Sequence, residues 1–188
     1  MANTSTIRFD MSAVRQLLDR LETLEPRIAR RFFVKALRAG AGPIQQSARS
    51  AVPVGPQFQL SLRGYAYQRP PPGNLRAAIK ITQGTDRRTG LHYVEVGPQY
   101  KRSAGVVVAP TYAHLVEYGT KPHVIRPRQR NGVLALAGRL IHGSVRHPGA
   151  RPHPYLRPAL EQNRTSAVSR VAESLNQSFA AMDLRAAI

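Results

Sequence analysis

Apolar residues recur with a helical period at both ends of the chain, and this feature restricts the possible folds most strongly. Near the N-terminus they occupy Val14, Leu17, Leu18, Leu21 and Leu24. Near the C-terminus they occupy Leu156, Leu160, Val168, Val171, Leu175, Phe179 and Met182. Such spacing places apolar side chains on one face of an amphipathic helix. The sequence predicts a first helix capped by Asp10 or Ser12, and a long last helix from near Pro154 to about Asp183.

A second helix is predicted from Pro26, because proline fits the first turn of a helix, where its missing N–H costs nothing. The helix is expected to kink near Pro43 and to continue to Pro53. Its apolar face contains Ile28, Ala29, Phe32, Phe33, Ala36 and Leu37. Its other side is basic, with Arg27, Arg30, Arg31, Lys35 and Arg38. This side could contact DNA, although a solvated face or one that meets acidic residues of a neighbour is commoner.

Short alternating segments between the helices indicate β-strands. Residues 74–82 and 91–96 alternate as two strands around a turn at 84–90, and weaker strands are predicted at 106–109 and 140–145. Because helices come first, strands next and a helix last, the pattern belongs to the α+β class. We expect N-terminal helices, a small antiparallel sheet of about four strands, and the long C-terminal helix packed on the sheet.

The region after the predicted strand at 106–109 combines a helix and a hairpin. Residues 112–118 fit a short helix that ends at the following glycine. The Asn-Gly pair at 131–132 is a strong turn signal, and it predicts a hairpin of residues 122–126 and 133–137.

The length of 188 residues favours one domain covering 1–188, with the proline-rich residues 53–74 as an extended arm or loop. The chain has no cysteine, which excludes disulfides and thiolate metal sites. The N-terminus lacks a secretory signal and no stretch is apolar enough to span a membrane. A soluble protein without a membrane partner is therefore expected.

The formal net charge is +18, and nearly all of the excess is arginine, since Lys occurs only at positions 35, 80, 101 and 121. Arginine binds phosphate and carboxylate through its planar fork. The charge balance therefore favours nucleic acid or an acidic protein surface as a partner.

Patterns typical of catalysis or metal binding are weak. Five histidines, His114, His123, His142, His147 and His153, lie close in the sequence without metal-ligand spacing. No nucleophile motif, carboxylate pair or phosphate-binding glycine loop is present. We therefore expect no catalytic residue, no metal and no cofactor, and a protein that is not an enzyme.

The segment from residue 110 to 160 is the most distinctive part of the chain. Between Tyr118 and Leu160 it has eight Lys or Arg, four His and no Asp or Glu. Glu117 stands alone at its start, where it could pair locally with Lys121 or Arg126, or form a salt bridge across a subunit boundary.

This segment resembles a tail-completion, or head–tail joining, family of long-tailed double-stranded DNA phages. Tyr112-Ala-His-Leu-Val-Glu-Tyr-Gly-Thr120 matches the family pattern YAxxVExGT, and His147-Pro-Gly through Pro158-Ala-Leu160 matches its second pattern. Val52-Pro53 and Gly73 to Ile79 also fit, apart from an insertion of about 17 residues before Gly73 and Ala78 in place of a small polar residue.

The resemblance implies a structural virion protein, made in the host cytoplasm, that sits at the head–tail interface. It implies a ring, commonly a hexamer, in the neck between head-closure or connector proteins and tail tube or tail terminator proteins, with contact to packaged DNA. A basic, non-enzymatic nucleic-acid-binding protein is the alternative. Predicted interface residues are Tyr112, Glu117, Tyr118, Lys121, Arg126, Arg151, Tyr155 and Arg157. Predicted DNA-proximal residues are Arg87, Arg88, Lys101 and Arg102.

Overall fold

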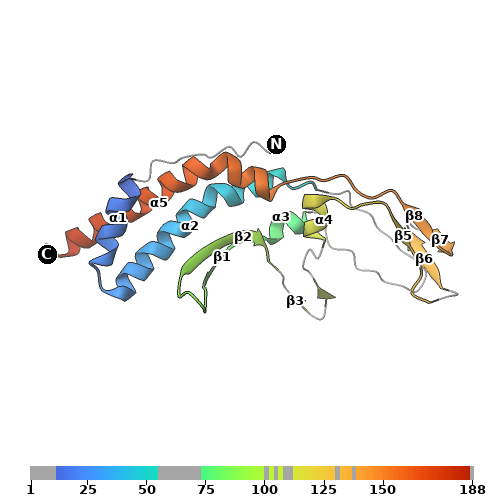
Figure 1. The fold of residues 1–188 in the computed structure, drawn as a ribbon, viewed down its shortest axis with the longest axis horizontal. Coiled ribbons are helices and arrows are strands. Elements are labelled where there is room, and N and C mark those ends of the chain that lie inside the picture. Colours follow the sequence, from blue (N-terminus) through green and yellow to red (C-terminus); the bar gives the residue numbers. More distant parts are fainter. Residues whose placement is uncertain are drawn as a thin grey trace. The chain divides into compact units, whose positions relative to one another are not determined.

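In the computed structural model the chain forms two compact units. Figure 1 draws the helices and strands of both. The first contains the described residues within Met1–Ala48, Lys80–Gly97 and Arg157–Ile188, and the second those within Arg49–Ile79 and Pro98–Leu156. The structure describes residues 12–54, 73–99, 102–103, 106–107, 112–129, 132–136 and 139–186. Most of the predicted proline-rich arm, residues 55–72, lies outside these ranges, and the single-domain organisation stays a prediction.

Three helices form the core of the first unit. They are α1 (Ser12–Glu22), α2 (Pro26–Ala51) and α5 (Leu156–Ala186), and α5 runs beside α2 in Figure 1. The predicted apolar faces meet, because Leu17, Leu21, Ala36, Leu175 and Phe179 form one buried cluster. The rings of Phe32 and Phe179 are edge to face, with centroids 5.7 Å apart. Apolar burial between these faces supplies the main stabilising term of the unit.

Helix α2 packs closely against α5 at Gly40. A Cβ at this position would lie 2.8 Å from the carbonyl oxygen of Ala167 and 2.7 Å from a methyl group of Val171. Gly42, two residues further along, has nothing within 4 Å of such a Cβ. The small residue at position 40 therefore permits the helix contact, whereas Gly42 has no such packing role.

Gly40→Ala is expected to be less stable than Gly42→Ala by about 1–3 kcal/mol, because only the first forces the two helices apart. Both changes gain the same helix propensity, so Gly42→Ala serves as the matched control. Urea denaturation of the two variants measures the difference. Equal midpoints would show that the helices do not approach as described.

A two-stranded hairpin completes the first unit. Its strands are β1 (Ile79–Thr85) and β2 (His92–Pro98). In the connecting turn, the carboxylate of Asp86 accepts hydrogen bonds from the backbone N–H groups of Arg88 at 2.7 Å and Thr89 at 3.0 Å. The hydrogen bond from Thr89, followed by the one from Arg88, holds the pKa of Asp86 below its usual value.

In the described part of the second unit there are two short helices and three small sheets. The helices are α3 (Asn74–Ala78) and α4 (Ala113–Tyr118). Three antiparallel pairs join β3 (Arg102–Ser103) to β4 (Val106–Val107), β5 (His123–Ile125) to β8 (Val145–His147), and β6 (Val133–Leu136) to β7 (Arg139–His142). Buried apolar residues of this unit are Val52, Leu75, Ile79, Ala113 and Tyr155.

The predicted α+β class is confirmed, with N-terminal helices, small antiparallel sheets and a long C-terminal helix. The strands of the described residues form four separate two-stranded sheets. Two local predictions were wrong. Residues 74–78 are helical instead of extended, and β5 pairs with β8 instead of with the strand that follows Gly132. Helix α2 is assigned as one continuous helix through Pro43.

Candidate functional site

Glu117, the isolated acid of the distinctive segment, lies beside the start of the long helix α5. It occupies the last turn of α4 and is only 6% exposed. Its Oε2 accepts hydrogen bonds from the backbone N–H groups of Tyr155 at 2.8 Å and Leu156 at 3.0 Å. Helix α5 begins at Leu156. The carboxylate therefore binds the N–H groups that a helix leaves unpaired at its N-terminus.

This position suits a carboxylate for two physical reasons. The N-terminus of a helix carries a partial positive charge, which attracts an anion. A charged acceptor also forms shorter and stronger hydrogen bonds with backbone N–H groups than a neutral one. Glu117 thus joins α4 to the start of α5 across 38 residues of sequence.

The two chain segments that flank Glu117 are joined by further backbone contacts. Thr120 and Ala150 form a two-way bridge, in which each backbone N–H donates to the carbonyl oxygen of the other, at 2.9 and 3.1 Å. The N–H of His153 donates to the carbonyl oxygen of Val116 at 2.8 Å. We name the structure built by residues 112–125 and 145–156 the signature frame. It holds both halves of the predicted family pattern together.

Two glycines make the close approach in the signature frame possible. Gly119 has a φ of 70°, and a Cβ there would lie 2.5 Å from the carbonyl oxygen of Ala150. Gly149 has a φ of 90°, and its Cβ would overlap the carbonyl oxygen of Thr120. A positive φ strains any residue with a side chain. The glycines of the Tyr-Gly-Thr and His-Pro-Gly motifs are therefore required by backbone packing.

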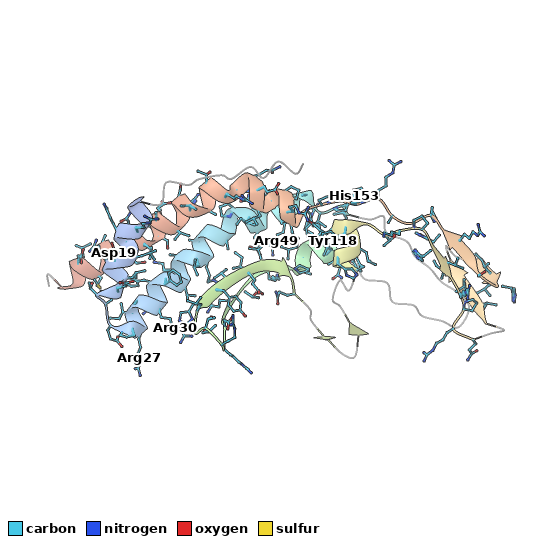
Figure 2. The ribbon with its side chains drawn as sticks, viewed as in Figure 1. Asp19, Arg27, Arg30, Arg49, Tyr118 and His153 are labelled. Atoms are coloured by element: carbon cyan, nitrogen blue, oxygen red, sulfur yellow. The ribbon has the colours of Figure 1, made fainter. Side chains whose placement is uncertain are left out.

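The predicted interface residues divide into a buried and an exposed set. Tyr155 and Glu117 are buried in the second unit, and Tyr112 is half-buried. Exposed are Tyr118, Lys121, Arg126, Arg151 and Arg157, and Figure 2 labels Tyr118 on α4. Glu117 and Tyr155 also make contacts within the chain itself. The predicted interface role of all eight residues stays a prediction.

The predicted DNA-proximal residues fall in two places. Arg87 and Arg88 are exposed in the turn between β1 and β2. Arg102 belongs to β3, while Lys101 lies outside the described residues. The structure therefore places only the first two side chains.

Two histidines of the signature frame lie side by side. His123 and His147 are register partners in the β5–β8 pair, and their ring centroids lie 5.0 Å apart. The Nδ1 of His123 donates to the carbonyl oxygen of Lys121, and the Nδ1 of His147 accepts from the N–H of Gly149. Within the described ranges, no three His, Cys, Asp or Glu residues are grouped as a metal site.

Sequence reasoning missed the bridge between Thr120 and Ala150 and the capping role of Glu117. Two facts in the sequence hinted at the cap: Glu117 is an isolated acid, and the helix predicted from Pro154 has no acidic residue in its first turn. The sequence could not show that Glu117 lies beside the start of α5, since Leu156 is 39 residues away from it in the chain.

The fold and the signature frame define a small α+β protein whose distinctive segment carries exposed cations such as Lys121, Arg126 and Arg151. The model of the HK97-gp10-like family, described as "Bacteriophage HK97-gp10, putative tail-component", matches residues 15–119. The match covers more than half of the chain, and the chain belongs to this family. The protein is thus a structural tail component of a bacteriophage, which implies a place in the virion and contacts with other head or tail proteins.

The match ends just after α4, so it includes Glu117 and Gly119 but not the second half of the signature frame. Neither the curated proteins nor the solved structures gave a significant match. None of the described helices has the length and apolar character needed to cross a membrane.

Proposed function

We propose that this protein is a ring-forming subunit of the phage neck, which joins the head-closure or connector complex to the tail tube. In this role it completes the tail by forming interfaces and catalyses no reaction. The ring is expected to be a hexamer that contacts tail terminator proteins and packaged DNA. Membership of a tail-component family supports a structural role, and the resemblance of the 110–160 segment to tail-completion proteins supports the position in the neck.

The observation that carries the proposal is the outer surface of α4. Leu115 is 40% exposed and Tyr118 is 67% exposed. They are three residues apart and therefore adjacent on the helix surface. From the opposite side, Glu117 fixes the same helix to the start of α5. A rigid helix that presents an aliphatic and an aromatic side chain to solvent is well suited to contact a partner, since ordering costs little on binding.

Tyr118→Asp is expected to prevent ring formation and head–tail joining while leaving the melting temperature within a few degrees of wild type. The change places a charge in the contact without disturbing a buried group. Light scattering and negative-stain imaging measure ring assembly, and complementation of a deletion phage measures joining. Leu184→Asp is the matched control, because Leu184 is 68% exposed but lies near the end of α5.

If the Tyr118→Asp variant still assembled fully, α4 would not be part of the subunit interface. A monomer that never assembles, yet binds free duplex with a steep salt dependence, would support the alternative of a basic nucleic-acid-binding protein. The net charge of +18 is the observation that favours this alternative.

A further inference from the structure

A basic pocket lies in the first unit, between the N-terminal half of α2 and the β1–β2 hairpin. Its volume is 520 Å³. Helix α2 contributes five cations and one apolar side chain, Arg27, Arg30, Arg31, Lys35, Arg38 and Val34. The hairpin contributes Gln83, Gly84, Thr85 and His92. None of the described residues that line this pocket has a carboxylate, and Figure 2 shows Arg27 and Arg30 on the first turns of α2.

The positive charge of the pocket is not neutralised by the described part of the chain. The Nζ of Lys35 donates to the hydroxyl of Ser178, and Arg38 donates to the amide oxygen of Gln83, both at 3.4 Å. These acceptors are uncharged. The ion pairs Arg20–Asp183 and Arg170–Glu173 involve no cation of the pocket.

The cations also repel each other. Arg27 and Arg31 are four residues apart on α2, and so are Arg31 and Lys35. Like charges at this spacing destabilise a helix. An anion bound in the pocket would remove this repulsion, so the arrangement favours an external anionic ligand.

The size of the pocket restricts the ligand. A sphere of 520 Å³ is about 10 Å across, which admits an extended polypeptide segment, since paired strands lie about 4.8 Å apart. The major groove of duplex DNA alone is about 12 Å wide, so a whole duplex does not fit inside the pocket.

The lining residues argue against single-stranded nucleic acid. Proteins that bind single strands stack the bases on aromatic side chains. Among the lining residues that the structure describes there is no Phe, Tyr or Trp, and the one aromatic ring is that of His92. That ring is engaged, because its Nδ1 is hydrogen bonded to the hydroxyl of Thr85 at 2.7 Å.

We infer that the pocket between α2 and the β1–β2 hairpin binds an acidic polypeptide segment of another virion protein. The arginines receive its Asp and Glu side chains through paired hydrogen bonds. The side-chain NH2 group of Gln83 provides a neutral donor for its backbone carbonyl oxygens. This binding site shares no residue with the α4 surface, so its test does not depend on ring formation.

The test measures binding of a fluorescein-labelled oligoglutamate peptide to the full chain by fluorescence anisotropy. A duplex oligonucleotide with the same number of negative charges is the second ligand. The pocket variant is Arg30→Gln with Arg31→Gln. The control variant is Arg87→Gln with Arg88→Gln, which removes two adjacent, exposed arginines that do not line the pocket. Both variants carry the same net charge.

The pocket variant is expected to raise the Kd for the peptide at least about tenfold, because two charge-assisted contacts are lost. The control variant is expected to change it less than about twofold, because it removes only long-range attraction. The peptide should also raise the melting temperature of the wild type, since it binds only the folded state. Unchanged melting temperatures of the two free variants establish that both remain folded.

Three results would overturn the inference. The first is no binding of the peptide to the wild type at low salt. The second is an equal loss of peptide binding in both variants, which would reduce the effect to net charge. The third is a larger loss of duplex binding than of peptide binding in the pocket variant, which would assign the pocket to nucleic acid.

Discussion

Glu117→Lys is expected to lower the free energy of unfolding by about 3–5 kcal/mol, which is the cost of breaking a buried charged contact. Two backbone N–H groups at the start of α5 lose their acceptor. A cation also replaces an anion at the helix end that carries a partial positive charge. Thermal and urea denaturation measure the loss.

Two further variants show whether the loss of stability comes from the charge reversal itself or from the position of Glu117. Glu117→Gln keeps an acceptor oxygen, so it is expected to cost only about 1–2 kcal/mol. Glu95→Lys makes the same charge reversal at an exposed position of β2, and is expected to change stability by less than about 0.5 kcal/mol. If Glu117→Lys were as stable as Glu95→Lys but failed to join heads to tails, Glu117 would instead act in a subunit interface.

The role of Glu117 illustrates what the sequence could and could not reveal. The isolation of this acid among cations marked it as unusual, and helix α4 around it was predicted from local spacing. Its partners are backbone groups, which have no sequence pattern of their own. Only the tertiary structure brings Tyr155 and Leu156 to its carboxylate.

The two wrong local predictions have a common physical origin. In residues 74–78 the alternation that indicated a strand also places Leu75 and Ile79 four residues apart, which is one helical turn. Gly73, with a φ of 77°, precedes the helix. Near residue 131, the Asn-Gly signal described a local turn, but strand pairing is decided by contacts over longer distances. The pairing of β5 with β8 brings His123 opposite His147, 24 positions away.

The helical core was the most predictable part of the fold. The apolar residues that recur with the helical period are the same residues that pack the helices together. Four of the five buried core members, Leu17, Leu21, Leu175 and Phe179, lie on the predicted apolar faces of the first and last helices, and Ala36 lies on that of the second. Only one wall of the basic pocket could be predicted from the sequence. The arginine face of α2 was evident from spacing, whereas the hairpin that forms its other wall is brought there by folding.

Phe179→Ala is expected to lower the free energy of unfolding by about 3–5 kcal/mol, because it leaves a large cavity among three helices. The side chain of Phe179 is 1% exposed. Its ring contacts Phe32 edge to face, and the guanidinium of Arg20 lies 4.3 Å from its centroid. Urea denaturation measures the loss. Leu184→Ala, at a position 68% exposed on the same helix, is expected to change stability by less than about 0.5 kcal/mol.

The contacts of Phe179 can be separated by a second change. Arg20 is exposed on α1, where it also pairs with Asp183 at 3.3 Å, and both side chains are more than half exposed. Solvent screens such a pair, so Arg20→Gln is expected to cost at most about 1 kcal/mol. A cost for Arg20→Gln that matched Phe179→Ala would mean that charge, and not apolar burial, holds α1 on α5. A cost below about 1 kcal/mol for Phe179→Ala would contradict the packing of the three helices itself.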